Sequence, residues 1–496
     1  MQTPLLNSLA VAAVLVQAIS ALQAQGTPPP AKPAAVEARP LANPQANQSA
    51  YDRFEERVRN PTDWLSWGAD LRVRDEFLEN TFMSAPIPGG PPPAPGTRYP
   101  DYNQIRIRAR MWGTVKPVSN LDLNLRFAWE SRVFTQPDEP VPAYAGGASM
   151  VDAFELDEFL IDNLNFRFTN ILNQPASLTV GRQDLFLGNG WFTGDGTPRD
   201  GSRTYFLDAA RMVWNFPEAK TLANLIYLEQ RARSDAWLPP INQQAYRRYL
   251  TEQDERGVIL YVSNKSISKT TLDGYFIYKH DEKALGSGAE GDIFGFGARA
   301  SVDLSDHWNL RGEFMPQFGE KQIGAGPEQD LEAFGANTLL TYSFKDSLKN
   351  QARLGYEYLS GDDAGSTGQN ERFDPLWGRW PQWSELLVYN LSTGPRPVDW
   401  GNLHRLNAGW GFSPTGKSKV TADYHALFAP TDDIRPIGTG GNFRGHLATA
   451  NFEYVHSIHL RGHLRAECFW PGDYYDGTGL NTDMETFLRA EILLTF

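Results

Sequence analysis

A strict alternation of apolar and polar residues, in segments of about ten residues, constrains the fold more than any other feature. In the final segment, 484–496, every second residue counted back from the end is apolar, namely Phe496, Leu494, Ile492, Ala490 and Leu488, and most residues between them are polar. Successive side chains of a β-strand point to opposite faces, so this period of two predicts a strand with one apolar face. A strand of a membrane barrel and an edge strand of a soluble sheet would both show this pattern. The other segments of the chain have to distinguish the two.

Segments of this kind recur along the chain from residue 67 onward. The eighteen segments span 67–78, 104–115, 121–133, 156–169, 177–187, 205–216, 221–232, 255–263, 270–280, 291–303, 306–318, 331–344, 349–360, 402–413, 417–428, 445–456, 458–469 and 484–496. Short and long connectors alternate between them, as in outer-membrane barrels with short periplasmic turns and long extracellular loops. We therefore predict an all-β fold, a transmembrane antiparallel β-barrel of about 18 strands, over a soluble β-sandwich with one solvated face.

One further apolar segment, SELLVYNL at 384–391, would be a nineteenth strand. It lies inside a long connector and would break the alternation of connector lengths, so we place it in an extracellular loop as a short helix. Every predicted periplasmic connector is short. Any gate is therefore expected from the extracellular loops, chiefly 79–103, 134–155 and 361–401.

The chain before the first strand has a different composition. Residues 1–24 contain the one long apolar run and are predicted to be a secretory signal peptide, with an N-terminal anchor helix as the alternative. Residues 25–62 are rich in Pro and Ala and are expected to be a periplasmic lead-in without fixed structure. Residues 63–496 are assigned to the barrel. A net charge of −13 with 41% hydrophobic residues argues against a helical membrane protein.

Arginines fix which face of the strands points inward. In segment 104–115, Arg106, Arg108 and Arg110 share one face, and Ile105 and Ile107 share the other. One arginine facing lipid near the midplane costs ~2–4 kcal/mol, so three in the wrong register would cost roughly 6–12 kcal/mol. That penalty is comparable to the stability of a typical domain. The arginines must face inward, and the lumen must be polar.

The same alternation makes the whole lumen rich in arginine. The inward arginines are Arg72, Arg74, Arg106, Arg108, Arg110, Arg126, Arg167, Arg211, Arg299, Arg311, Arg353, Arg405, Arg461, Arg465 and Arg489. The inward acids are Asp70, Glu130, Asp303, Glu313, Glu357, Asp423, Glu453, Glu467 and Glu491. A surplus of guanidinium groups attracts anions and pairs well with carboxylates. The alternative for any one arginine is structural pairing across the wall.

A selectivity filter is predicted at the arginine triplet of segment 104–115, because three neighbouring arginines need many acidic partners to be neutralised. Arg72 and Arg74 on the first segment and Arg126 on the third flank the triplet and are expected to act with it.

Several stretches carry a resemblance to a known family. They are LTVGRQDLFLGNGWF at 178–192, GDGTPRDGSRTYFLDAARM at 194–212, the stretch 356–389 with its FDPLWGRW, and the closing segment. The chain resembles the alginate export family of outer-membrane porins, from about residue 67 to the end. The resemblance implies an eighteen-stranded barrel and export of an anionic polysaccharide, alginate or something like it, through an arginine-lined constriction. It also implies that Arg182 is a lumen residue. Strict alternation puts Arg182 on the lipid side, and a bulge would reconcile the two.

These observations predict a passive channel in the outer membrane of a Gram-negative bacterium, conducting an alginate-like polyuronate outward. A general or small-anion-selective porin is the alternative, and a closed structural barrel is a third hypothesis. The sequence has no catalytic, phosphate-binding or cysteine-based metal motif, so we expect no enzyme, no cofactor and no metal. The expected partners are the anionic solute, outer-membrane lipid, periplasmic export proteins, and the barrel-assembly machinery through the strand ending at Phe496, but not nucleic acid.

Overall fold

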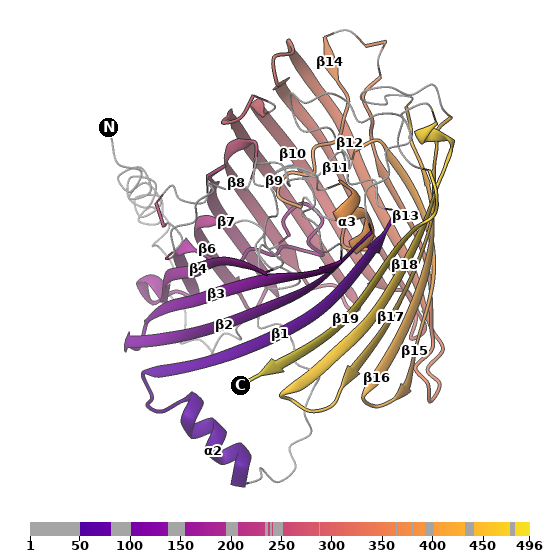
Figure 1. Ribbon diagram of the computed structural model, residues 1–496. Helices are drawn as coiled ribbons and strands as arrows, with labels where there is room; N and C mark the ends of the chain where they lie inside the picture. Colours follow the sequence, from indigo (N-terminus) through magenta and orange to yellow (C-terminus); the bar gives the residue numbers. More distant parts are fainter. Residues whose placement is uncertain are drawn as a thin grey trace.

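The described part of the chain is a closed β-barrel. The computed structural model describes residues 50–80, 101–136, 154–194, 207–233, 237–238, 241, 251–286, 288–363, 365–366, 368–378, 381–391, 401–431, 441–476 and 482–496. Within these residues, eighteen antiparallel strands form the wall, and each pairs with its neighbours in sequence (Figure 1). The predicted fold class is confirmed.

The strands follow the predicted segments closely. The first half of the wall comprises β1 (Leu65–Glu79), β2 (Tyr102–Val118), β3 (Leu121–Gln136), β4 (Phe154–Thr169), β5 (Ala176–Arg182), β6 (Asp208–Phe216), β7 (Thr221–Gln230), β8 (Gln253–Asn264) and β9 (Thr270–Lys283). The second half comprises β10 (Ala289–Asp303), β11 (Trp308–Ile323), β12 (Glu328–Ser343), β13 (Gln351–Leu359), β15 (Leu403–Thr415), β16 (Ser418–Phe428), β17 (Phe443–Val455), β18 (Leu460–Pro471) and β19 (Glu485–Thr495).

The barrel closes where the first strand meets the last. β1 and β19 pair over ten residues on each side, from Asp70–Thr495 to Glu79–Thr486. The amide of Ala69 donates to the carbonyl oxygen of Phe496 at 3.1 Å, and the amide of Phe496 donates back at 2.8 Å. Closure satisfies the backbone groups that an open sheet would leave unpaired, which lipid cannot satisfy. The two-residue strand β14 (Gln369–Asn370) pairs with β12 and lies outside the wall, since β13 pairs directly with β15.

The two faces of the wall differ in polarity. On β1, the buried residues Arg72 and Arg74 alternate with Leu71 and Val73, which are exposed on the outside. Other exposed apolar side chains of the outer face are Met111, Phe166, Leu260, Phe296, Phe314, Leu354, Leu406, Tyr424, Leu464 and Ile492. The outer face is therefore suited to lipid, and the charged groups face the interior.

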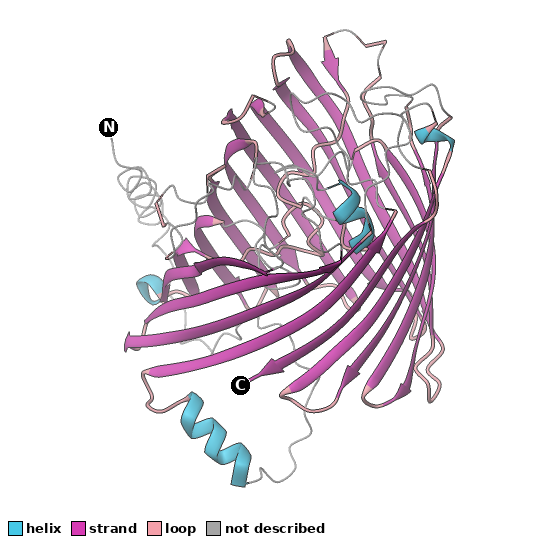
Figure 2. Ribbon diagram, in the orientation of Figure 1, coloured by secondary structure: helices cyan, strands magenta, loops and turns pink. Residues whose placement is uncertain are grey.

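Among the described residues, short helices make up the rest of the regular structure (Figure 2). They are α2 (Ala50–Arg59), α3 (Glu385–Leu391), and the 3-10 turns η1 (Ile171–Asn173) and η2 (Asp473–Tyr475). Helix α3 confirms the placement of 384–391 outside the wall. No helix among the described residues is long and apolar enough to cross a membrane.

Helix α2 corrects part of the expectation for the lead-in. Residues 50–59 were expected to lack fixed structure but form a helix that contacts the barrel. The carbonyl of Val58 accepts a hydrogen bond from the Trp67 indole at 2.7 Å, and Glu55 pairs with His459 at 2.9 Å. These two contacts attach the helix to the wall at β1 and before β18. The predicted signal peptide, 1–24, and the rest of the lead-in to residue 49 lie outside the described residues.

Two segments between strands fold into the barrel. The inner loop, residues 183–194, follows β5, which ends at Arg182 and not at the predicted residue 187. Its Leu185 is fully buried. The crossing segment, residues 371–378 and 381–391, comes from the long connector predicted at 361–401. In the other two predicted gating loops, 81–100 and 137–153 lie outside the described residues.

Candidate functional site

One wall of the lumen carries a ladder of inward arginines. The arginine ladder comprises Arg72, Arg74, Arg106, Arg108, Arg110 and Arg489, from β1, β2 and β19. Their side chains are between 2% and 11% exposed. Because the three strands are hydrogen-bonded neighbours, inward positions of the same level lie side by side.

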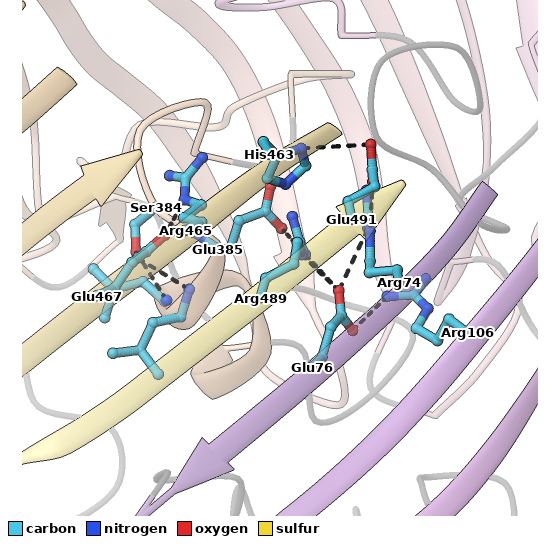
Figure 3. A network of polar contacts seen from close by, with 12 residues as sticks. Arg74, Glu76, Arg106, Ser384, Glu385, His463, Arg465, Glu467, Arg489 and Glu491 are labelled. Carbon is cyan, nitrogen blue, oxygen red and sulfur yellow. Dashed lines mark hydrogen bonds and ion pairs between the residues drawn. The ribbon is translucent and has the colours of Figure 1, made fainter. Parts of the chain in front are cut away.

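Carboxylates are interleaved with the ladder (Figure 3). Glu76 accepts from Arg106 at 3.1 Å and from Arg489 at 2.7 Å. Glu130 accepts from Arg106 at 3.1 Å and lies 3.4 Å from Arg72. Each of these carboxylates therefore bridges two guanidinium groups and holds adjacent strands together.

The other arginines of the ladder are paired with carboxylates in the same way. Glu491 accepts from Arg74 at 2.6 Å. Asp70 accepts from Arg110 at 3.0 Å and lies 3.8 Å from Arg108. Every arginine of the ladder thus has a carboxylate partner.

Each arginine of the predicted triplet has a carboxylate close by, although the six ladder arginines share five carboxylates, and the role of the triplet as a selectivity filter stays a prediction. The wall supplies acids at the same level from neighbouring strands: Asp70 is in register with Arg110, and Glu130 with Arg108. Buried charges in a low dielectric require such partners, and these ion pairs also link neighbouring strands of the wall.

Arg126, the predicted flank of the triplet, ties the inner loop to the wall. It donates to Asp162 at 2.8 Å and forms a two-pronged pair with Asp184 at 2.9 Å. Asp184 belongs to the inner loop, and Asp162 lies where the register between β3 and β4 shifts. Such two-pronged pairs are strong and directional, so Arg126 fixes the loop's position.

The crossing segment is anchored first on the β8–β12 wall. Asp374 accepts from Lys321 at 2.5 Å and lies 3.6 Å from Lys279. The ring of Phe373 packs where a Cβ at Gly335 would sit, 2.8 Å from such an atom at its Cζ. The indole of Trp377 packs in the same way over Gly257 on β8. Glycines on the inner face therefore leave the space that these two aromatic side chains fill.

The crossing segment has a second anchor on β18 and β19 (Figure 3). Glu467 accepts from the Ser384 hydroxyl at 2.6 Å and from the amides of Glu385 and Leu386 at 2.9 and 3.2 Å, at the start of α3. Glu385 in turn pairs with Arg489 of the ladder at 2.9 Å. In the strand order, β8 and β18 are about half a circumference apart, so the segment crosses the lumen.

A cavity of about 380 Å³ lies beside the crossing segment, against the wall from β11 to β18. Four arginines line it, together with tryptophans from the two inward segments: Arg311, Arg353, Arg405, Arg465, Trp191 and Trp383. Amide side chains of Asn337, Asn407 and Asn451 add hydrogen-bonding groups. The cavity therefore combines cations, amides and aromatic rings.

Three of the cavity arginines are held by carboxylates. Arg353 donates to Asp423 at 2.8 Å across Gly409, which is in register with both. Arg405 donates to Glu357 at 2.9 Å and lies over the Trp383 ring, 4.8 Å from its centroid. Arg465 pairs with Glu467 at 2.5 Å. These pairs orient the guanidinium groups along one wall of the cavity.

Comparison with known proteins was decisive for the family. The sequence model of the family described as "Alginate export" matches residues 63–488. The chain belongs to the alginate export family. The predicted family and location are thereby confirmed: this is an outer-membrane barrel of a Gram-negative bacterium. No match was found among curated protein sequences.

Solved structures similar to this alginate export family barrel are outer-membrane porins. A BenF-like porin from Pseudomonas fluorescens Pf-5 is 11% identical with a TM-score of 0.53, covering 87% of this chain and 98% of that one. OccAB4 from Acinetobacter baumannii is 12% identical with a TM-score of 0.50, covering 88% and 100%. OccK5 (OpdH) from Pseudomonas aeruginosa is 10% identical with a TM-score of 0.50, covering 87% and 98%. At these identities the likeness shows the fold alone.

The other predicted site residues of this family member are dispersed. Arg299 pairs with Asp273 at 2.6 Å on the β9–β10 wall. Arg461 lies at the exposed start of β18. Arg182 does not join the ladder: it pairs with Asp208 at 3.1 Å and lies 5.2 Å from the centroid of the Trp237 ring. These arginines do not converge on the cavity.

Several residues that shape the site carried only weak signals in the sequence. Lys321 and Lys279 lie on inward positions but are not arginines, and Asp374 and Trp377 lie in a connector. Inward glycines in strands, such as Gly257, were the available signal, because a glycine within a strand marks close approach of another group. No group of His, Cys, Asp and Glu within the described ranges could hold a metal ion.

Proposed function

We propose that this barrel is a passive channel for an anionic, carboxylate-bearing saccharide, an alginate-like polyuronate, moving outward across the outer membrane. The family match supports an outer-membrane channel. The observation that carries the choice of solute is the cavity beside the crossing segment, where four arginines and two tryptophans face the same space.

The chemistry of the cavity fits such a solute. Guanidinium groups attract anions and bind carboxylates through paired hydrogen bonds. Asn337 and Asn407 can exchange hydrogen bonds with sugar hydroxyls, and tryptophan rings pack against the apolar faces of sugar rings. The barrel has no access to ATP, so net flux follows the concentration gradient set by synthesis in or near the periplasm.

A small-anion porin remains the second candidate, because the crossing segment narrows the lumen. A cavity of about 380 Å³ is at the lower end of the range for small-molecule pockets, which suits single sugars or small anions as well as one section of a polymer chain.

Planar-bilayer conductance with the purified full chain separates these functions. We would measure the anion/cation permeability ratio and the current block by oligomannuronate, with neutral dextran of equal length as the control. Anion selectivity with block by the uronate alone is the expected result. Anion-selective current without oligomer block would favour the small-anion porin, and absence of any current would contradict both.

A further inference from the structure

We propose that the cavity contains a discrete binding site for one uronate ring, in which Arg311 receives the carboxylate and Trp191 and Trp383 flank the ring. The inference rests on the proposed function and deepens it, because it locates the recognition of charge at one residue on β11 and not at the arginine ladder.

Arg311 differs from the other arginines of the cavity. Arg353, Arg405 and Arg465 each have a carboxylate within 2.9 Å. Within the described ranges, Arg311 has no such ion pair, and its buried Nε has no hydrogen-bond partner. A buried donor without a partner is costly, and a ligand oxygen that accepts from it recovers that cost. The carboxylates of Glu313 and Glu357 interact with Arg311 electrostatically but form no ion pair with it, so its guanidinium group keeps donors for a ligand.

The wall beside Arg311 leaves room for a ring. Arg311 is in register with Leu339, Leu339 with Gly355, and Gly355 with Asn407 on the successive strands β11, β12, β13 and β15. Gly355 adds no side chain of its own at this level, and the side chains of Asn407 and Leu339 lie 3.3 and 3.4 Å from where its Cβ would be. The Asn407 Nδ2 donates to Asp423 and to the Tyr424 carbonyl, and its Oδ1 would accept from a ring hydroxyl while Arg311 holds the carboxylate.

The aromatic side of the site is rigid. Trp191 stacks on Phe373 with ring centroids 5.4 Å apart and donates from its indole to Glu357 at 3.0 Å. Trp383 is held between Arg405 and His425, whose ring centroid lies 5.2 Å away. Both tryptophans line the cavity that Arg311 lines. Fixed rings need no ordering when a solute arrives, which favours binding.

The decisive experiment compares two charge removals of equal size. Arg311→Met removes a cavity cation without breaking an ion pair of the described residues. Arg461→Met is the matched control, since Arg461 also has no ion pair among the described residues and lies outside the cavity lining. For each full-length variant we would measure half-block of the current by D-mannuronate, with D-mannose as the neutral probe.

We expect Arg311→Met to raise the half-blocking concentration of D-mannuronate about tenfold or more, with block by D-mannose unchanged, and Arg461→Met to change it less than about twofold. Arg311→Lys keeps the charge but loses the two-pronged geometry and should fall between them. Equal block of the wild type and Arg311→Met would overturn the site. An equal rise of the half-blocking concentration of D-mannuronate in Arg311→Met and Arg461→Met would overturn it too.

Calorimetric titration of D-mannuronate into the detergent-solubilised protein distinguishes this failure from failure of the proposed function. Binding that depends on Arg311 in a barrel that passes no current would refute the channel and keep the site. Polymer-blocked current in the wild type, with no D-mannuronate binding, would refute the site and keep the channel.

Discussion

Gly409 is the residue on which the Arg353–Asp423 pair depends. The three residues are in register across β13, β15 and β16, and the ion pair passes over the glycine. A Cβ at position 409 would collide with Asp423 and lie 3.0 Å from the Arg353 Nε. A side chain as small as a methyl group would separate the two charges.

We therefore expect Gly409→Ala to destabilise the barrel by about 1–3 kcal/mol, as overpacking does, and to disturb the cavity. Gly274→Ala is the matched control, because nothing lies within 4 Å of a Cβ built on that strand residue. Urea unfolding of both variants in liposomes measures the difference. Equal midpoints would show that the wall adjusts without losing the pair.

Arg106 tests the structural role of the ladder. It pairs with Glu76 and Glu130, which are almost fully buried. Removal of one partner from a buried pair costs about 3–5 kcal/mol, so Arg106→Met should lower the free energy of unfolding by that order. We expect its anion/cation permeability ratio to change less than that of Arg311→Met. If Arg106→Met lowered the anion/cation permeability ratio more than Arg311→Met does, the triplet would again be the preferred selectivity filter.

At the scale of elements, the crossing segment is the main determinant of lumen shape. It is attached to opposite walls through Asp374 and through the contacts of Glu467 with the start of α3. Both anchors are charged and buried, so the segment is expected to remain in place while ions pass.

Replacement of residues 371–391 by a flexible Gly/Ser linker should raise the single-channel conductance several-fold and abolish selective block by oligomannuronate. The reason is that the segment supplies Trp383 and one side of the cavity. A milder change, Glu467→Gln, should loosen the start of α3 by about 1 kcal/mol and increase current noise. Unchanged conductance after loop replacement would mean that the narrowest point lies elsewhere.

At the scale of the whole molecule, one closed sheet separates lipid from lumen. Leu354 on β13 is 61% exposed on the outer face, and Thr449 on β17 lines the cavity. The two positions therefore sample opposite sides of the same wall.

We expect Leu354→Arg to cost about 2–4 kcal/mol if it lies near the midplane, and Thr449→Arg to cost much less and to increase anion selectivity. Folding yield in liposomes, read from heat-modifiable migration on gels, measures the first effect, and bilayer permeability measures the second. Similar losses for both variants would contradict the assignment of faces.

The period-two alternation determined the barrel by itself. The count and spacing of the alternating segments indicated the strand number and the alternation of connectors. A register error would have put arginines in lipid, and this cost determined which face of each strand points inward. The alternation did not predict helix α2 or the end of β5 at Arg182, because both depend on tertiary contacts. The hydrogen bond from Trp67 to Val58 holds the helix, and the inner loop begins where β5 ends.

Only the tertiary structure decided which arginines have a carboxylate in ion-pair contact. Alternation places Arg108 and Arg311 equally inward, but Arg108 has Asp70 close by and Arg311 has no carboxylate partner among the described residues. Pairing depends on the acids that neighbouring strands and inward segments bring to the same level. Contacts such as Glu76–Arg489, between the first strand and the last, exist only after the barrel has closed.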